Sequence, residues 1–173
     1  MSDPFTTMGV EPKFDLDLDK LAERHRDLSR ALHPDRYAGA PAAERRLALG
    51  RAIEVNDAFR VLKDPVRRAE ALLRRAGVPV GETAEPKPSQ ALLMDMMEQR
   101  EELADARRAK DLPAVQKLAA SIRDRERAVL ERLGRALEAE GSALPQALPH
   151  LGELRYLRRF LDEVSAIEED LAP

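Results

Sequence analysis

The chain has 173 residues, a formal net charge of −3 at pH 7, 43% hydrophobic residues and only 3% aromatic residues. A chain of this length forms one domain or two small ones, and its near-neutral charge argues against a general nucleic-acid binder, which normally carries a basic excess. It contains no cysteine, which excludes disulfides, thiolate nucleophiles and cysteine-ligated metals.

Helix-forming residues dominate the composition. Ala, Leu, Glu and Arg are common, and the alternating β-branched runs that are typical of strands are nearly absent. The sequence therefore predicts an all-α protein. The first residues lack the basic and apolar regions of a signal peptide, and no apolar run approaches membrane-spanning length. We expect a cytoplasmic protein with no membrane partner.

The first predicted element is a short helix over residues 4–9, with Asp3 as its N-cap and Gly9 at its end. A second helix is predicted from Asp15 or Asp17 to about residue 32. His25 lies on its apolar stripe, which consists of Leu18, Leu21, Leu28 and Leu32. The basic side chains of this helix are Lys20, Arg24, Arg26 and Arg30.

His33, Pro34 and Asp35 follow this helix directly. Proline has no N–H and disfavours a helical conformation in the residue before it, so the helix must stop here. A histidine in the last turn suits the negative end of the helix dipole. Asp35 is then presented on a loop, where residues that contact a partner are common. A simple turn explains Pro34, but it explains the pairing of His33 with Asp35 poorly.

Two more helices are predicted before a linker. One covers about 42–62, and the next begins with Pro65 at its first position and ends before Gly77. Their expected apolar stripes are Ala48, Ala52, Val55, Phe59 and Leu62, then Val66, Ala69, Leu73 and Ala76. Residues 77–88 hold three prolines and two glycines, which mark a linker.

The second half of the chain predicts three helices. The first covers about 89–109, the second covers about 111–140, and the third ends at about residue 171. Ser89 caps the first, and Gly141 ends the second. The expected inward residues of the last two are Val115, Leu118, Ile122, Val129, Leu133 and Leu137, then Leu151, Leu154, Leu161 and Val164. Such helices bury their stripes most simply as an antiparallel three-helix bundle. The predicted organisation is two helical units, 1–76 and 89–173, joined by the linker 77–88.

The helix at 89–109 carries two neighbouring apolar lines. The first line consists of Leu92, Met96 and Leu103. Leu93 and Met97 form the second, which can stay exposed while the first faces the core, and methionine suits a surface that repacks against partners. Tyr156 is similarly offset on the last helix and is expected to reach the same surface, with Glu98 and Glu101 at its rim. The alternative is that all the apolar residues are ordinary core.

A His-Pro-Asp loop between two helices resembles the J-domain, the module that activates DnaK-type chaperone ATPases. Residues 54–65, Glu-Val-Asn-Asp-Ala-Phe-Arg-Val-Leu-Lys-Asp-Pro, resemble its second long helix and the Asp-Pro stop. The segments that follow stand in an order similar to that of HscB-type co-chaperones of iron–sulfur cluster assembly. They are residues 65–73, Pro-Val-Arg-Arg-Ala-Glu-Ala-Leu-Leu, then the linker, then residues 92–103, Leu-Leu-Met-Asp-Met-Met-Glu-Gln-Arg-Glu-Glu-Leu. The resemblance covers nearly the whole chain. It implies an L-shaped protein in which a J-domain precedes a C-terminal oligomerisation and client-binding three-helix domain.

The resemblance implies that Asp35 engages an arginine of a DnaK- or HscA-type chaperone and favours ATP hydrolysis, with His33 and Pro34 shaping the loop. The four basic residues at 20, 24, 26 and 30 would attract an acidic surface of that chaperone. Glu23 and Asp27 interleave with them, so a plain solvated face is the alternative.

The resemblance also places the binding of an IscU-like iron–sulfur scaffold protein on Leu93, Met97 and Tyr156. Met94, Glu98 and Glu101 would lie nearby. No cofactor or metal site is expected. In this interpretation the chain delivers the scaffold protein to the chaperone and stimulates the chaperone's ATPase.

An enzyme is not expected. His33 and Asp35 could form an acid–base pair, and His25 lies two turns away, but no positioned nucleophile or phosphate-binding glycine loop accompanies them. Two other functions stay open. One is a J-domain co-chaperone for a different client, and the other is a nucleic-acid-binding helical module, which only the arginine-rich first half supports.

Overall fold

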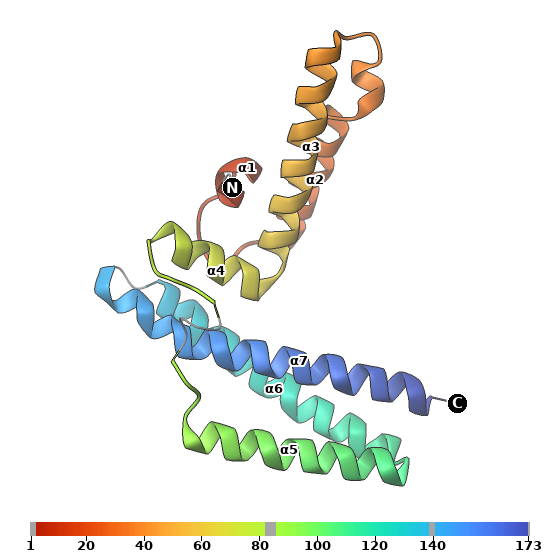
Figure 1. Cartoon of the computed structure of the whole chain (residues 1–173), viewed down its shortest axis with the longest axis vertical. Helices are drawn as coiled ribbons and strands as arrows, with labels where there is room; N and C mark the ends of the chain where they lie inside the picture. The colour runs from red at the N-terminus through yellow and green to blue at the C-terminus, as the bar shows by residue number, and fades with distance from the viewer. Residues whose placement is uncertain (1–2, 82–85, 139–140, 173) are drawn as a thin grey trace. The chain divides into compact units, whose positions relative to one another are not determined.

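The computed structural model describes residues 3–81, 86–138 and 141–172 (Figure 1). Within these ranges the regular secondary structure is helical and contains no strand, which confirms the predicted all-α class. The chain forms two compact units, Met1–Pro79 and Val80–Pro173.

The α-helices of the first unit lie close to the predicted ranges, and a 3₁₀ helix lies in the stretch that the sequence predicts as a loop. The helices are α1 (Pro4–Met8), α2 (Leu18–Ala31), the 3₁₀ helix η1 (Pro34–Tyr37), α3 (Ala42–Lys63) and α4 (Pro65–Arg75). The carboxylates of Asp3 and Asp17 accept the backbone N–H groups of Thr6 and Lys20 at 3.3 and 3.0 Å, so they cap α1 and α2. Gly9, with φ of 64°, adopts the left-handed conformation that ends α1.

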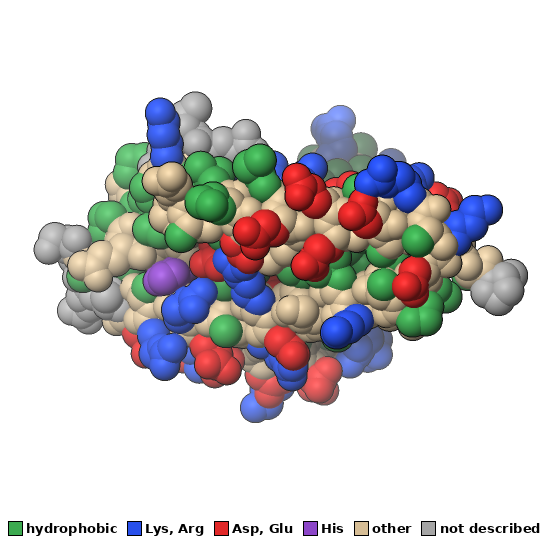
Figure 2. All heavy atoms as spheres, turned by 90° about the horizontal axis from the view of Figure 1, so that it is seen from below, with side chains coloured by type: hydrophobic (Ala, Val, Ile, Leu, Met, Phe, Trp, Pro, Cys, Tyr) green, Lys and Arg blue, Asp and Glu red, His purple; other side chains and the backbone are tan. Residues whose placement is uncertain are grey.

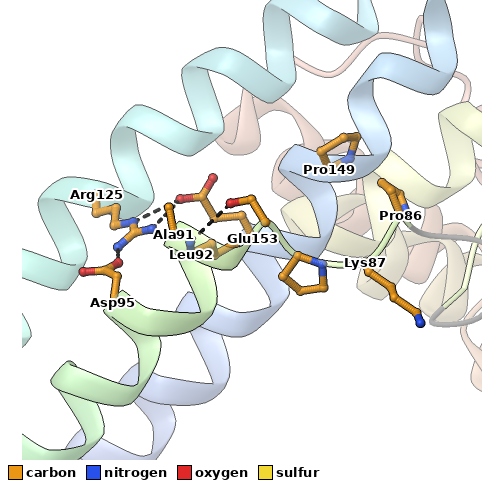
Figure 3. Close-up of a pocket in the computed structure, with 10 residues that line it drawn as sticks. Pro86, Lys87, Ala91, Leu92, Asp95, Arg125, Pro149 and Glu153 are labelled. Atoms are coloured by element: carbon orange, nitrogen blue, oxygen red, sulfur yellow. Dashed lines mark hydrogen bonds and ion pairs between the residues drawn. The ribbon is translucent and has the colours of Figure 1, made fainter.

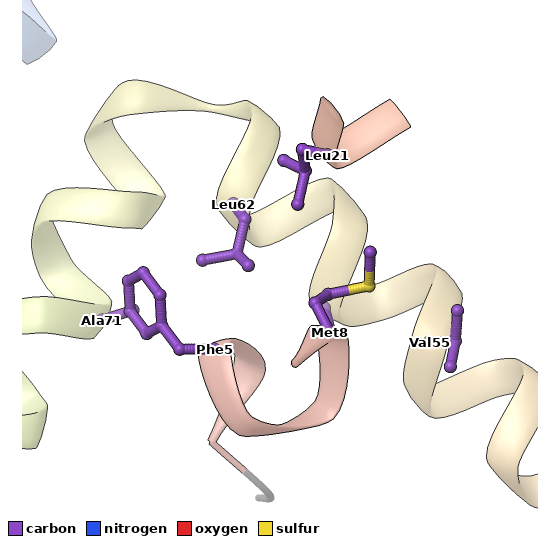
Figure 4. Close-up of a cluster of buried hydrophobic side chains, with 7 residues drawn as sticks. Phe5, Met8, Leu21, Val55, Leu62 and Ala71 are labelled. Atoms are coloured by element: carbon purple, nitrogen blue, oxygen red, sulfur yellow. The ribbon is translucent and has the colours of Figure 1, made fainter. Parts of the chain in front are cut away.

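The core of the first unit forms where α1 packs against the hairpin of α2 and α3. Phe5 and Met8 of α1 are fully buried and belong to one cluster with Leu62 of α3, Leu21 of α2 and Ala71 of α4 (Figure 4). A helix of five residues is not stable by itself in water. The burial of Phe5 and Met8 therefore holds α1 in place.

Two positions of the predicted stripes in the first unit are exposed. Leu18 is 46% exposed. It lies one turn before Leu21, which packs with Leu62 in the last turn of α3, so α3 ends before it can cover Leu18. Ala76 is also exposed, because α4 ends at Arg75 and Ala76 is only its C-cap.

Arg68 is a buried charged residue that the sequence did not single out. Its Nη1 donates a hydrogen bond of 2.7 Å to the carbonyl oxygen of Leu62, and its guanidinium lies 5.0 Å from the centre of the Phe14 ring. Burial lowers the pKa of Arg68, while the carboxylates of Asp64 and Asp15 oppose that change. The carbonyl groups at a helix end carry partial negative charge, so Arg68 stabilises the junction of α3 and α4.

We predict that residues 1–79 fold without the rest of the chain, because the cluster around Phe5 and Leu62 lies wholly within them. Thermal unfolding followed by circular dichroism should show one cooperative transition. Phe5→Ala in the same fragment is the control and should remove about 3–5 kcal/mol of stability. A wild-type fragment that melts without cooperativity would show that the unit depends on the second half.

Within residues 86–138 and 141–172, neighbouring α-helices of the second unit run antiparallel (Figure 1). Its elements are α5 (Gln90–Ala109), α6 (Leu112–Leu137), the 3₁₀ helix η2 (Gly141–Ala147) and α7 (Leu148–Leu171). Helix α5 packs on α6, and α6 packs on α7. As predicted, Ser89 caps α5, accepting the N–H of Leu92 at 3.2 Å. Helix α6 ends at Leu137, earlier than the predicted end near residue 140, and residues 139–140 lie outside the described ranges.

The buried face of α7 shifts around the helix along its length. Buried residues recur at three-residue spacing, at Leu148, Leu151, Leu154, Leu157 and Phe160. Each residue turns an α-helix by about 100°, so each step of three moves the buried position back by about 60°. Leu161, predicted to face inward, is consequently only half-buried, and Phe160 is buried instead.

Candidate functional site

The His-Pro-Asp turn is a single turn of 3₁₀ helix, η1. His33 is its N-cap, and the Nδ1 atom of His33 accepts the backbone N–H of Asp35 at 3.3 Å. This hydrogen bond requires a lone pair on Nδ1, and so a proton on Nε2 in the neutral ring. His33 therefore shapes the turn that Pro34 begins.

The Asp35 carboxylate remains open to a partner. Its side chain is 90% exposed, and its Oδ2 atom lies 3.5 Å from His33 Nδ1. No backbone N–H donor to Asp35 Oδ1 or Oδ2 occurs among the hydrogen bonds of the described residues. Both carboxylate oxygens can thus accept the paired N–H groups of an arginine.

The four basic residues of α2 are all exposed, but they lie on two sides of the helix. At about 100° per residue, Lys20 and Arg24 fall on one side, and Arg26 and Arg30 fall on the other. Arg24 Nε donates a hydrogen bond of 3.3 Å to the carbonyl oxygen of Met8, at the end of α1. Arg24 therefore stabilises the fold of the first unit, in addition to any attraction that it exerts on a partner.

Helix α5 exposes a row of apolar side chains in its first half. Leu93, Met94 and Met97 are 45%, 56% and 64% exposed, whereas Leu92 and Met96 are half-buried. The two apolar lines therefore separate as predicted, one turned inward and one exposed. Figure 2 views the second unit from the α5 side and shows hydrophobic side chains gathered toward one end, with acidic side chains beside them.

The exposed row has an acidic rim on its own helix. Glu98 and Glu101 are both exposed, and helical geometry places them on the same side of α5 as the apolar residues. We call the exposed surface of Leu93, Met94, Met97, Glu98 and Glu101 the α5 face.

The prediction that Tyr156 reaches this surface as an exposed residue is wrong. Tyr156 is only 6% exposed. Its hydroxyl donates a hydrogen bond of 3.2 Å to the backbone carbonyl of Met96, on the inner side of α5. The shift of the buried face around α7 explains the error, because it brings residue 156 beneath α5 rather than beside it.

Two family models match the chain in order. Residues 3–71 match the DnaJ domain, and residues 88–165 match the HSCB C-terminal oligomerisation domain. The co-chaperone protein HscB homologue of Burkholderia multivorans is 36% identical, over 96% of this chain and 94% of its own length. The chain belongs to the HscB co-chaperone family.

Other HscB proteins agree over the same length. The co-chaperone protein HscB homologue of Mannheimia succiniciproducens is 33% identical, and 99% of each chain is covered. The solved structure of chaperone HscB from Vibrio cholerae is 30% identical, with a TM-score of 0.86 over 99% of this chain and 100% of that one. The matched DnaJ domain of this HscB-family chain contains the His-Pro-Asp turn, and the matched C-terminal domain contains the α5 face.

A bridge of charged groups connects the three helices of the HscB C-terminal domain. The Arg125 guanidinium of α6 lies between Asp95 of α5 and Glu153 of α7 (Figure 3). Its Nε and Nη2 atoms lie 3.0 and 2.9 Å from Glu153 Oε1, and Arg132 Nη2 reaches Glu153 Oε2 at 3.2 Å. Nothing in the sequence indicates this bridge, because charged residues on a helix usually mark a solvated face.

The Tyr156 hydroxyl offers a pH-dependent test of its burial. Burial raises the pKa of Tyr156, with partial opposition from Arg100, above the value of about 10 for an unfolded tyrosine. The folded chain then binds this proton more tightly than the unfolded chain. The contribution of the Tyr156 hydroxyl to the free energy of unfolding is full below about pH 10 and is lost as the pH rises through the raised pKa.

We therefore expect the melting temperature of the wild type to fall more steeply above about pH 10 than that of Tyr156→Phe. Melting curves recorded across this range for both proteins check the difference. Parallel curves would contradict the burial of an ionisable hydroxyl at this position.

The described residues contain no group of three or more side chains arranged to hold a metal ion. Within the same ranges no helix has the length and apolar character needed to cross a bilayer. An open cavity of about 440 Å³ lies beside the Arg125 bridge, with Pro86, Leu92 and Pro149 in its lining (Figure 3). Two exposed surfaces, the η1 turn and the α5 face, carry the residues that the sequence singles out.

Proposed function

We propose that this HscB-family chain stimulates the ATPase of a DnaK- or HscA-type chaperone through the His33-Pro34-Asp35 turn. The exposed carboxylate of Asp35 supports this proposal, because it is held on an ordered turn with its oxygens open to an arginine. The exposed side chains of Arg26 and Arg30 on α2 would add attraction toward an acidic surface.

We propose further that the α5 face binds an IscU-like iron–sulfur scaffold protein. Three large apolar side chains rimmed by two glutamates are exposed on one side of a helix, and exposed apolar clusters with polar rims mark interaction sites. Methionine contributes two of the three and can repack against a partner. The chain would then deliver the scaffold protein to the chaperone, without itself being an enzyme.

The observation that carries the proposal is the presence of two exposed sites on two separate units of one chain. The experiment is an ATPase assay of a DnaK-type chaperone with this chain, the scaffold protein, or both. We expect stimulation by the chain and greater stimulation when the scaffold protein is added. Stimulation by the chain together with no binding of the scaffold protein would point to a different client, and no stimulation at all would reject the co-chaperone mechanism.

A further inference from the structure

The first half of α5 is held by few apolar contacts. Leu103, in its second half, is the buried residue of this helix. Leu92 and Met96 are only half-buried, and Ser89 caps the helix from an exposed position. Apolar burial therefore fixes the later turns of α5 more firmly than the turns that carry Leu93 and Met97.

Polar contacts supply the missing attachment at those turns. Asp95 pairs with Arg125, and the carbonyl of Met96 accepts the Tyr156 hydroxyl. These two neighbouring residues of α5 are thus joined to α6 and α7 respectively. Glu153 of α7 forms an ion pair with Arg125 and a second ion pair with Arg132.

The bridge is partly shielded from solvent. The side chains of Arg125, Glu153 and Asp95 are 27%, 15% and 41% exposed. Burial by itself would lower the pKa of Arg125, but its contacts with Asp95 and Glu153 raise it overall. A planar guanidinium that contacts two carboxylates on different helices also fixes their orientation, which a lysine could not do in the same way.

The attachment points face away from Leu93 and Met97. At about 100° per residue, Asp95 lies on the opposite side of the helix from Leu93 and Met97. Asp95 and the Tyr156 hydroxyl therefore do not compete with a partner for the exposed side chains. They set the rotation and the rigidity of the turns on which those side chains stand.

We propose that Asp95, Arg125, Glu153 and the Tyr156 hydroxyl are positioning groups that fix the first half of α5 and so hold the α5 face in its partner-binding geometry. This inference rests on the proposed scaffold-binding function. Tyr156 then acts from beneath the helix, through Met96, rather than by touching the partner.

The test compares Asp95→Asn and Tyr156→Phe with the wild type in the full chain. Asp95→Glu restores the carboxylate and serves as the conservative rescue, and Asp105→Asn is the matched control. Asp105 lies on the same helix and, among the residues that the structure describes, pairs only with its exposed neighbour Arg108. Each protein is titrated with the IscU-like scaffold protein, and the exchange of the backbone amides of residues 92–97 is measured in its absence.

We expect Asp95→Asn and Tyr156→Phe each to weaken scaffold binding by roughly three- to tenfold and to speed amide exchange in residues 92–97, as the loss of one hydrogen bond or charged contact implies. Asp95→Glu should recover most of the affinity, and Asp105→Asn should match the wild type. ATPase stimulation without the scaffold protein should be equal in all five proteins.

Unchanged amide exchange in both variants would overturn the inference, because the groups would then not fasten the helix. Faster exchange with wild-type affinity would overturn it as well, since the positioning would not matter to the partner. A failure of the proposed function gives a different result, because the wild-type chain itself would then not bind the scaffold protein. That result would reject the positioning role as well.

Discussion

Asp35→Asn should lower the stimulation of a DnaK-type chaperone's ATPase by roughly 10- to 100-fold, because a hydrogen bond to a charged group contributes about 1.5–3 kcal/mol. The amide keeps the size of the side chain but carries no charge, and it can present only one acceptor oxygen to an arginine. The hydrogen bond that shapes the turn survives, because it runs from the backbone N–H of residue 35 to His33 Nδ1. The melting temperature should stay within error of the wild type, since the side chain is 90% exposed.

The matched control for this substitution is Asp57→Asn. Asp57 is an exposed carboxylate on the same hairpin, paired with Arg60 at 3.7 Å, and it lies outside the turn. We expect it to change stimulation by no more than about twofold, the usual size of a surface ion-pair effect. Equal losses in the two variants would mean that general charge, rather than the geometry of the turn, drives the chaperone contact. Full stimulation by Asp35→Asn would reject the role proposed for the turn.

The sequence predicts the helices of this chain well because their ends are determined locally. Asp3, Asp17 and Ser89 each cap a helix with a side chain that reaches a backbone N–H three residues later. Pro34 and Gly9 act through their own backbone conformations. None of these effects needs knowledge of a distant residue, so they can be read without a structure.

The errors on α7, and the charged residues that the sequence did not single out, concern contacts between helices. The sequence predicts that Leu161 faces inward, but the buried face of α7 shifts and Phe160 is buried instead. The same shift places Tyr156 under α5. Arg125 and Arg68 resemble surface charges in the sequence, yet each holds two or more elements together. Pairing of this kind depends on the rotation of each helix about its axis, which a one-dimensional pattern does not fix.

The α5 face is the site for which the sequence left two interpretations open, and exposure separates them in part. Leu93 and Met97 are exposed as the binding interpretation requires, whereas Tyr156 is buried as the core interpretation requires. A variant that replaces all three residues with alanine would therefore mix two effects. Tyr156→Ala alone should cost about 3–5 kcal/mol of stability, the usual range for removing a buried aromatic ring.

Leu93→Ala combined with Met97→Ala should isolate the binding effect. We expect this double variant to weaken the binding of an IscU-like scaffold protein by roughly 30-fold or more, because apolar anchors at the centre of an interface can each contribute about 2 kcal/mol. Its melting temperature should hardly change, since substitutions of exposed residues usually alter stability by no more than about 0.5 kcal/mol. Stimulation of the chaperone's ATPase without the scaffold protein should be preserved.

The matched control is Leu49→Ala combined with Ile53→Ala. These two residues are 57% and 54% exposed and lie on α3 of the first unit, so the control removes a similar exposed apolar area at a distance in sequence from α5. A titration of the scaffold protein beside a melting curve for both double variants distinguishes the outcomes. A low melting temperature for Leu93→Ala with Met97→Ala would assign these residues to the bundle core. An intact melting curve with wild-type affinity would show that the scaffold protein binds elsewhere on the chain. Equal losses of scaffold affinity in the two double variants would mean that affinity follows exposed apolar area in general rather than the α5 face.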